Sequence, residues 1–251
     1  MGQDGRVLDY DDEARRYDAT RGGEPRARAA AEAGERLLPQ GPCVVLDIAC
    51  GTGIVTRRLS RPERTVVGVD RSPGMLGLAA RRLPEGVVRG DATRLPFAAD
   101  AVDAVVIVWL LHLLEDPLPV LAEAARVLRP GGVLITTVDK NDAYFAEDSD
   151  VARATADLRR HYAPRVPDRS SLVHRWASER GLRTAGRTAF PGTGQGRSPR
   201  EWREVIEAGL IPWCTRAPRN EVAEVCRRLA ALPEQDSARP DPLYRLVALR
   251  A

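Results

Sequence analysis

The residues best placed to bind a ligand follow an apolar run at 44–48, where the chain turns through Gly51 and Gly53 into a helical stretch. Glycine has no side chain to keep a ligand away from the backbone, and the start of a helix offers unpaired N–H groups. A tight turn from strand to helix also needs glycine for steric reasons alone. The turn therefore indicates a ligand site only if other residues point to the same place.

Two carboxylates follow the next two strand-like runs. Asp70 ends the second run, 23 residues after Asp47, and Asp91 stands in a Gly90-Asp91-Ala92 turn after the third. Ligands of open α/β sheets bind at the carboxyl ends of the strands, and an acidic residue that ends the second strand can accept hydrogen bonds from a ribose diol. These positions predict a ribose-bearing ligand, although Asp70 could instead cap a helix or lie in solvent.

Five strand-like runs alternate with helical stretches, and this alternation would position the two carboxylates. Such a rhythm is typical of a parallel sheet with helices on both faces. Ser72-Pro73 is a typical helix start, and the segment 129–132, Arg-Pro-Gly-Gly, is a typical stop. The expected strands are 44–48, 66–70, 87–90, 102–109 and 132–139, and the expected helices between them are 54–60, 73–83 and 118–129.

The rest of the chain is expected to complete the sheet and to add a cap. We predict a doubly wound, mostly parallel, seven-stranded α/β sheet with a partly helical insert after the fifth strand. The further expected elements are a helix at 25–38, a partly helical stretch at 141–180, a strand at 182–190, a helix from Ser198-Pro199, a helix at 218–231 and a strand at 243–249. We expect one domain, divided into a helical cover (1–43), a ligand-binding core (44–139), a cap (140–180) and the final strands and helices (181–251).

A set of short motifs occurs in a fixed order along the first part of the chain. The motifs are DIACGTG at 47–53, VVGVD at 66–70, GDATRLPF at 90–97, VDAVVIVW at 102–109 and LRPGG at 128–132. Over about residues 15–140 this combination resembles the class I S-adenosylmethionine-dependent methyltransferases, in the subgroup of ubiquinone and menaquinone biosynthesis enzymes and natural-product methyltransferases. The resemblance implies a Rossmann-like fold, S-adenosyl-L-methionine as cofactor, and methyl transfer to a small molecule, with secondary metabolism as a candidate setting.

The resemblance also implies roles for individual residues. Tyr17 and Arg21 would close over the cofactor, with Arg21 toward its carboxylate, although Arg21 could equally be a surface residue. Asp47 would order the glycine turn and the cofactor's ammonium group. The remaining roles are the methionine part for Ala49, Cys50, Gly51 and Gly53, the ribose hydroxyls for Asp70, the flanks of the adenine for Arg71 and Met75, the adenine amino group and ring for Asp91 and the N–H of Ala92, and a place beside the cofactor for Val108.

His112 is the best-placed candidate for a catalytic side chain. A sulfonium methyl group is already activated, so the protein mainly has to align the reactants and exclude water, with no covalent intermediate. His112 follows the fourth expected strand and could act as a general base. A histidine that only packs or makes a structural hydrogen bond is the alternative. Aromatic residues that could line a pocket for a flat or apolar substrate, or pack in a core, are Trp109, Tyr144, Phe145, Trp202 and Trp213.

Composition argues against several kinds of partner. The 38 basic and 35 acidic residues are interspersed and give a net charge of +3, which does not favour nucleic acid. The four cysteines and three histidines lack ligand spacing, so we expect reduced thiols and no metal. Because no long apolar run occurs and the first residues are acidic and polar, we expect a cytoplasmic protein without a membrane partner. It would act on a small-molecule acceptor as a monomer or homodimer.

Two other functions stay open from the sequence. A nicotinamide-dependent oxidoreductase shares the glycine turn and the acidic residue, but its fingerprint needs Gly or Ala where this chain has Thr56. A methyltransferase-like protein could also bind the cofactor without transferring a methyl group, as a cyclase or regulatory partner, because fold does not fix function. The acceptor atom, O, N or C, is likewise open, and its determinants are expected in 141–180 and 190–215, where the chain departs from the family.

Overall fold

The computed structural model describes residues 9–83, 86–163 and 166–251, and it separates into two compact units. Unit 1 comprises the chain up to Lys140 together with Pro167–Phe190 and Tyr244–Ala251. Unit 2 comprises Asn141–Val166 and Pro191–Leu243. The chain therefore passes between the units four times, and unit 2 draws on both the predicted cap and the predicted final segment.

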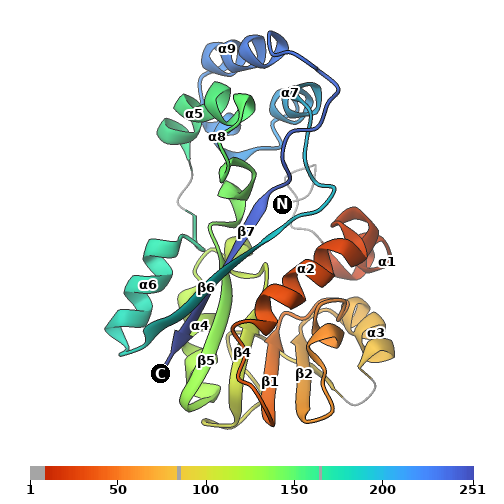
Figure 1. Ribbon diagram of the computed structural model, residues 1–251, viewed down its shortest axis with the longest axis vertical. Coiled ribbons are helices and arrows are strands. Elements are labelled where there is room, and N and C mark those ends of the chain that lie inside the picture. Colours follow the sequence, from red (N-terminus) through yellow and green to blue (C-terminus); the bar gives the residue numbers. More distant parts are fainter. Residues whose placement is uncertain (1–8, 84–85, 164–165) are drawn as a thin grey trace. The chain divides into compact units, whose positions relative to one another are not determined.

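Unit 1 is built on one seven-stranded sheet with the order β3-β2-β1-β4-β5-β7-β6 (Figure 1). Strands β1 to β5 pair in parallel, and β7 runs antiparallel to β5. The predicted seven-stranded, mostly parallel α/β sheet is confirmed. The strands are β1 (Cys43–Ile48), β2 (Arg64–Asp70), β3 (Val87–Arg89), β4 (Val102–Ile107), β5 (Leu128–Val138), β6 (Arg183–Pro191) and β7 (Leu243–Arg250).

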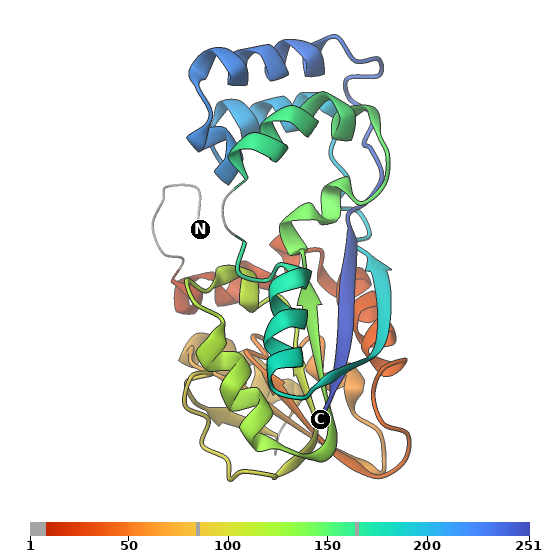
Figure 2. The same cartoon turned by 90° about the vertical axis from the view of Figure 1, so that its left-hand side faces the viewer.

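Helices cover both faces of this sheet. Figures 1 and 2 show α4 and α6 over one face and α2 over the other. The helix expected at 54–60 is only a short 3-10 turn, because Gly53, at φ +71°, still belongs to the preceding turn. The helices are α1 (Tyr10–Thr20), α2 (Gly23–Glu35), η1 (Thr56–Leu59), α3 (Pro73–Arg82), η2 (Leu111–Leu113), α4 (Leu118–Val127), η3 (Lys140–Phe145), which begins at the end of unit 1, and α6 (Ser170–Glu179).

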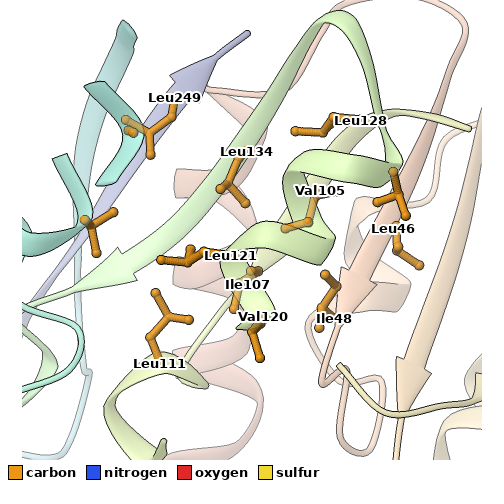
Figure 3. Packing of buried hydrophobic residues seen from close by; sticks show 14 of the residues in the cluster. Leu46, Ile48, Val105, Ile107, Leu111, Val120, Leu121, Leu128, Leu134 and Leu249 are labelled. Carbon is orange, nitrogen blue, oxygen red and sulfur yellow. The ribbon is translucent and has the colours of Figure 1, made fainter. Parts of the chain in front are cut away.

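The core of unit 1 lies between the sheet and α4 with α6. Figure 3 shows Leu46 and Ile48 of β1 beside Val105 and Ile107 of β4, because alternate residues of a strand face the same side. Helix α4 turns an apolar stripe toward them, with buried side chains at positions 120, 121, 124 and 127. Each large apolar side chain buried in this way stabilises the fold by roughly 1.5 to 3 kcal/mol. This packing holds the strands rigidly and so fixes the positions of their carboxyl ends.

The strand order reverses between β1 and β4, since β2 and β3 continue on one side and β5 on the other. Ligands of open α/β sheets bind in the crevice at such a switch point. Three neighbouring strands also end in a non-glycine residue with left-handed backbone: Ala49 after β1 (φ 58°), Trp109 after β4 (φ 60°) and Asp139 after β5 (φ 51°). Because this conformation is costly for such residues and clusters at functional sites, it marks this edge of the sheet.

Unit 2 is a small helical body with a core of its own. Helix α7 starts with a full capping box, in which Ser198 and Glu201 bond each other's backbone N–H. The loop at 192–196 wraps the carboxylate of Asp241, which accepts backbone N–H groups from residues 194, 195 and 196. The helices are α5 (Asp150–Tyr162), α7 (Pro199–Glu207), α8 (Pro212–Arg216) and α9 (Arg219–Ala230). None of the helices in the described ranges is both long and apolar enough to span a bilayer.

Candidate functional site

A cavity of about 470 Å³ lies in unit 1 at the carboxyl ends of the strands. Helix α1 contributes Tyr10 and Tyr17, and the segment after β4 contributes an apolar wall that includes Trp109. The sequence-predicted residues that line this cavity are Tyr17, Ala49, Gly51, Asp70, Arg71, Met75, Asp91, Ala92 and Val108. The structure thus brings together nine positions that are spread over more than ninety residues of sequence.

Asp70 is fixed at the centre of this wall by its own backbone neighbours. Gly51 N donates to Asp70 Oδ2 at 2.8 Å, and Ser72 N donates to Asp70 Oδ1 at 2.9 Å. A carboxylate has about four acceptor sites, so each oxygen can accept a further hydrogen bond from a ligand. The same side chain therefore couples the glycine turn to the start of α3 and presents a charged acceptor to the cavity.

Asp91 provides a second acidic position in the cavity wall. Its Oδ1 accepts from Thr93 N at 2.8 Å and from Thr93 Oγ1 at 2.7 Å. These hydrogen bonds, with help from Arg71, hold the pKa of Asp91 below its ordinary value. Among the described residues, Asp91 Oδ2 has no hydrogen-bond partner and can accept a hydrogen bond from an amino group of a ligand.

Three of the residues predicted around the glycine turn shape it without lining the cavity. Asp47 is 3% exposed and accepts from Thr56 Oγ1 at 2.6 Å, and burial raises its pKa to about 7. Gly53 lies against α3, where a Cβ atom would come within 3.2 Å of the Ala79 side chain. Cys50 is buried against β2. Asp47 thus bonds Thr56, just after the glycine turn, and does not reach the cavity where the cofactor's ammonium group is expected.

Arg21 does not line the cavity, whereas a neighbouring arginine lies next to it. Arg21 is exposed, with its guanidinium 5.9 Å from the ring of Tyr17. Arg26 on α2 is only 6% exposed and lies 3.4 Å from the ring centroid of Trp109. Its Nη1 donates to the carbonyl oxygen of Arg21 at 2.6 Å. Sequence reasoning missed Arg26, although its spacing from Ala30 and Ala33 places it on the buried face of a helix, which is a usable signal.

Trp109 is held in place by its backbone, by two aromatic rings and by the guanidinium of Arg26. Its backbone N donates to Thr137 Oγ1 at 2.9 Å, which supports the left-handed backbone. The rings of Phe190 and Tyr244 contact its indole edge-on, each at a centroid distance of 5.7 Å. Trp109 is therefore a rigid wall at the end of the cavity. The other aromatic residues named from the sequence, Tyr144, Phe145, Trp202 and Trp213, pack in unit 2.

His112 lies on η2, just behind this wall. Leu110, Leu113 and Leu114 line the cavity, but the ring of His112 does not. Its Nδ1 is buried and has no hydrogen-bond partner within the described part of the chain. Burial, together with the nearby charges of Lys140, Arg26 and Arg21, lowers the pKa of His112 to about 2. The imidazole is therefore neutral at physiological pH and accepts a proton only weakly.

Helix α1 is fastened over the site by two carboxylates. Asp18 accepts from Thr52 Oγ1 at 2.6 Å and from Arg82 Nη2 at 2.7 Å. At the other end of the helix, Asp11 accepts from Gly74 N at 2.8 Å and from the hydroxyl of Ser72. Both contacts reach elements that border the cavity. They keep the two tyrosines of α1 in its wall.

A second hollow, of about 620 Å³, lies near the amino ends of the strands. Its charged groups mostly serve the fold, since the buried Arg64 pairs with Glu35 and Arg36 bonds Thr188. It is an open groove far from the switch point, and we assign it no chemistry. Within the described ranges, no three His, Cys, Asp or Glu side chains gather so that they could hold a metal ion.

The fold and this site resemble those of class I methyltransferase domains of the Rossmann-like type. Residues 46–136 match the family model described as a methyltransferase domain. A demethylmenaquinone methyltransferase of Mycolicibacterium paratuberculosis is 43% identical over 132 residues, which cover 50% of this chain and 56% of that enzyme. The chain thus spans about half the length of the curated relatives it matches, and the family resemblance read from the motifs is confirmed in this region.

Solved structures extend the similarity of fold to most of the chain. A geranyl diphosphate C-methyltransferase of Streptomyces coelicolor, solved with S-adenosyl-L-homocysteine, has a TM-score of 0.54 and 16% identity, and the match covers 98% of this chain and 85% of that one. The cyclase SpnF has a TM-score of 0.58 and 19% identity, and the match covers 96% of this chain and 93% of that one. At these identities the likeness concerns the fold, and the fold carries more than one kind of reaction.

Proposed function

We propose that this protein transfers the methyl group of S-adenosyl-L-methionine to a small-molecule acceptor. One observation carries the proposal: nine residues predicted from the methyltransferase motifs meet in one cavity at the switch point of the sheet. The match of residues 46–136 to the methyltransferase family model and the 43% identity over 132 residues to a demethylmenaquinone methyltransferase support it.

The residues of the cavity fit the adenosine part of this cofactor and leave space for its methionine part. The two oxygens of Asp70 would accept the ribose hydroxyls, and Asp91 with Ala92 would hold the adenine. The backbone at Ala49 and Gly51 leaves room for the methionine part. When bound, the cofactor supplies a methyl group activated by the sulfonium, so the chain's own task is to orient and to exclude water.

His112 stays our candidate for a general base in an O-methylation. In the described structure its ring does not line the cavity, and burial keeps its pKa low. The role of general base therefore requires that the ring contact the acceptor when the acceptor is bound. We further propose that the protein is a cytoplasmic monomer or homodimer. We also propose that it does not act on nucleic acid, since its charges are interspersed along the chain.

Calorimetric titration with S-adenosyl-L-methionine tests the first half of the proposal. We expect micromolar binding that a chelator does not change. Loss of binding on chelation would contradict a metal-free site, and tight binding of NADH would favour the oxidoreductase reading.

Incubation with a methyl-labelled cofactor and a panel of phenols, amines and acidic carbon compounds tests the second half. Transfer of label, with release of S-adenosyl-L-homocysteine, is the expected result. A protein that binds the cofactor tightly and converts an acceptor without transferring label would instead behave as a cyclase-like member of the fold.

A further inference from the structure

Unit 2 holds two half-buried arginines without an ion pair. Arg159 on α5 and Arg197, just before α7, lie within 4 Å of no carboxylate in the described part of the chain. The other half-buried arginines of unit 2, Arg203 and Arg239, each contact a carboxylate. A partly desolvated positive charge is costly unless a counter-charge meets it, so this pair stands apart from the ordinary surface arginines.

Both guanidinium groups rest on one cluster of aromatic rings. The Cζ atom of Arg159 lies 3.9 Å from the ring centroid of Phe145, and that of Arg197 lies 5.2 Å from those of Tyr144 and Trp202. The Trp202 ring contacts the other two rings, at centroid distances of 5.2 and 5.4 Å. Stacking on an aromatic face fixes the plane of a guanidinium and leaves its N–H edge available.

Much of the donor capacity of the two side chains is unused. Arg159 donates Nε to Thr155 Oγ1 at 3.2 Å and Nη2 to Ala152 O at 2.9 Å, which leaves Nη1. The guanidinium of Arg197 meets no hydrogen-bond acceptor among the described residues, although a guanidinium has five N–H donors. Burial lowers the pKa of Arg159, and only the exposed Asp142 acts in the opposite direction.

We propose that Arg159 and Arg197 bind the oxyanion, a carboxylate or a phosphate, of a small molecule whose apolar part packs beside Tyr144 and Phe145. Arginine is suited to this because its planar fork matches such oxyanions with paired hydrogen bonds. Tyr144 and Phe145 are half-buried, so each offers some apolar surface next to the charges. The residues of this site all belong to unit 2, so the inference goes beyond the proposed function and does not depend on it.

A matched pair of probes tests the charge requirement on the full chain. Biphenyl-4-carboxylate and biphenyl-4-carboxamide have nearly the same shape and differ in charge. With S-adenosyl-L-homocysteine present, we expect calorimetry to show the acid binding at least about 10-fold more tightly than the amide, the effect of losing a charge-assisted hydrogen bond. Equal affinities, or no binding of either probe at millimolar concentration, would overturn the proposal. Biphenyl-4-yl phosphate in parallel tells which oxyanion is preferred.

Substitutions locate the preference. Arg159→Met and Arg197→Met keep much of the apolar stem but remove the charge, and the double variant should lose the preference for the acid. Arg200→Met is the control for each single variant. Arg200 is exposed and pairs with Asp236, and its loss lowers the net charge by one, as the loss of Arg159 or Arg197 does. An equal loss in Arg200→Met would show non-specific attraction and refute the site. Arg197→Lys, which keeps the charge, should retain part of the preference.

Two further measurements distinguish a failure of the oxyanion site from unfolding of a variant and from a failure of the proposed function. Thermal melting of each variant shows whether it is folded, and the comparison of acid with amide on the wild-type protein depends on no variant. The affinity for S-adenosyl-L-homocysteine, measured on the same samples, reports on unit 1 alone. A protein that does not bind the cofactor but prefers the acid would sink the proposed function and leave the oxyanion site standing.

Discussion

Asp70 has two tasks at the scale of a single residue, because its oxygens accept the N–H groups of Gly51 and Ser72 and also face the cavity. We expect Asp70→Ala to weaken cofactor binding by roughly 1 to 3 kcal/mol, since two ribose hydroxyls would lose a charged acceptor. Calorimetry measures this directly.

A second variant at Asp70 tests how much of the cofactor affinity depends on the acceptor oxygens. Asp70→Asn keeps one acceptor oxygen and should lose less affinity than Asp70→Ala, while Asp12→Asn, an exposed change on α1, should lose none. Unchanged affinity in Asp70→Ala would mean that Asp70 is not the ribose ligand.

The role of His112 is decided by comparing turnover with stability. As a general base, His112→Ala should lower turnover by about 100-fold or more and leave cofactor affinity nearly unchanged. Because burial lowers its pKa to about 2, we expect no inflection from this group in the rate between pH 6 and 8.

A packing role for His112 predicts the reverse pattern. His112→Ala would then lose roughly 1 to 3 kcal/mol of stability and keep its turnover per folded molecule. Melting temperature and turnover on one preparation decide between the two roles.

The sequence predicted the site residues that belong to ordered motifs, and it missed those that depend on tertiary packing. Asp70 and Asp91 follow their strands in chain order, so the parallel sheet alone brings them together. Arg26 belongs to no motif, and it reaches Trp109 because the fold brings α2 beside the segment that follows β4 and beside Tyr244 of β7. Arg21 was expected to reach the cofactor's carboxylate, yet it is exposed.

At the scale of elements, α1 depends on the carboxylate of Asp18 for its attachment. We expect Asp18→Asn to raise the dissociation constant of the cofactor about 10-fold, because its charge-assisted bonds to Thr52 and Arg82 hold Tyr17 in the cavity wall.

Asp12→Asn serves as the matched control for this change. It removes the same charge from the same helix, at an exposed position. If the cofactor dissociates from Asp18→Asn and Asp12→Asn at the same rate in stopped-flow measurements, α1 does not act as the cover of the site.

Helices with a Ser-Pro start or an apolar stripe were predictable, and α1, which has neither, was not. Ser72-Pro73 and Ser198-Pro199 both begin helices whose serine caps a backbone N–H. Helix α1 has no apolar stripe, and Ala14 is its only fully buried residue, so tertiary contacts through Asp11 and Asp18 hold it instead.

At the scale of the whole molecule, the chain leaves unit 1 after Lys140 and returns to it at Pro167. The buried carboxylate of Asp168 lies where these two segments of unit 1 meet. Asp168 accepts from Lys140 N at 2.8 Å, and its carbonyl accepts from Asp139 N at 2.9 Å. Burial raises the pKa of Asp168 from 3.8 to about 6. The charged form is thus disfavoured in the folded state, so this group's penalty is absent below about pH 4 and complete above about pH 6.

We therefore expect Asp168→Asn to raise the free energy of unfolding by roughly 1 to 2 kcal/mol at pH 8 and to change it little at pH 4, since the amide oxygen can still accept from Lys140. Denaturant titrations at the two pH values measure this. Asp236→Asn, which removes a surface carboxylate paired with Arg200, should not raise the free energy of unfolding at pH 8. A gain at pH 4 as large as that at pH 8 would contradict the assignment.

The pairing of β7 with β5 has a consequence for how the protein is made. Residues 139–242 separate the two strands, so β5 leaves the ribosome with one edge unpaired. At about 5 to 20 residues per second, that edge waits on the order of 5 to 20 seconds for its antiparallel partner. An open strand edge invites pairing with other chains, which makes nascent chains halted before residue 243 the species that aggregates or recruits chaperones.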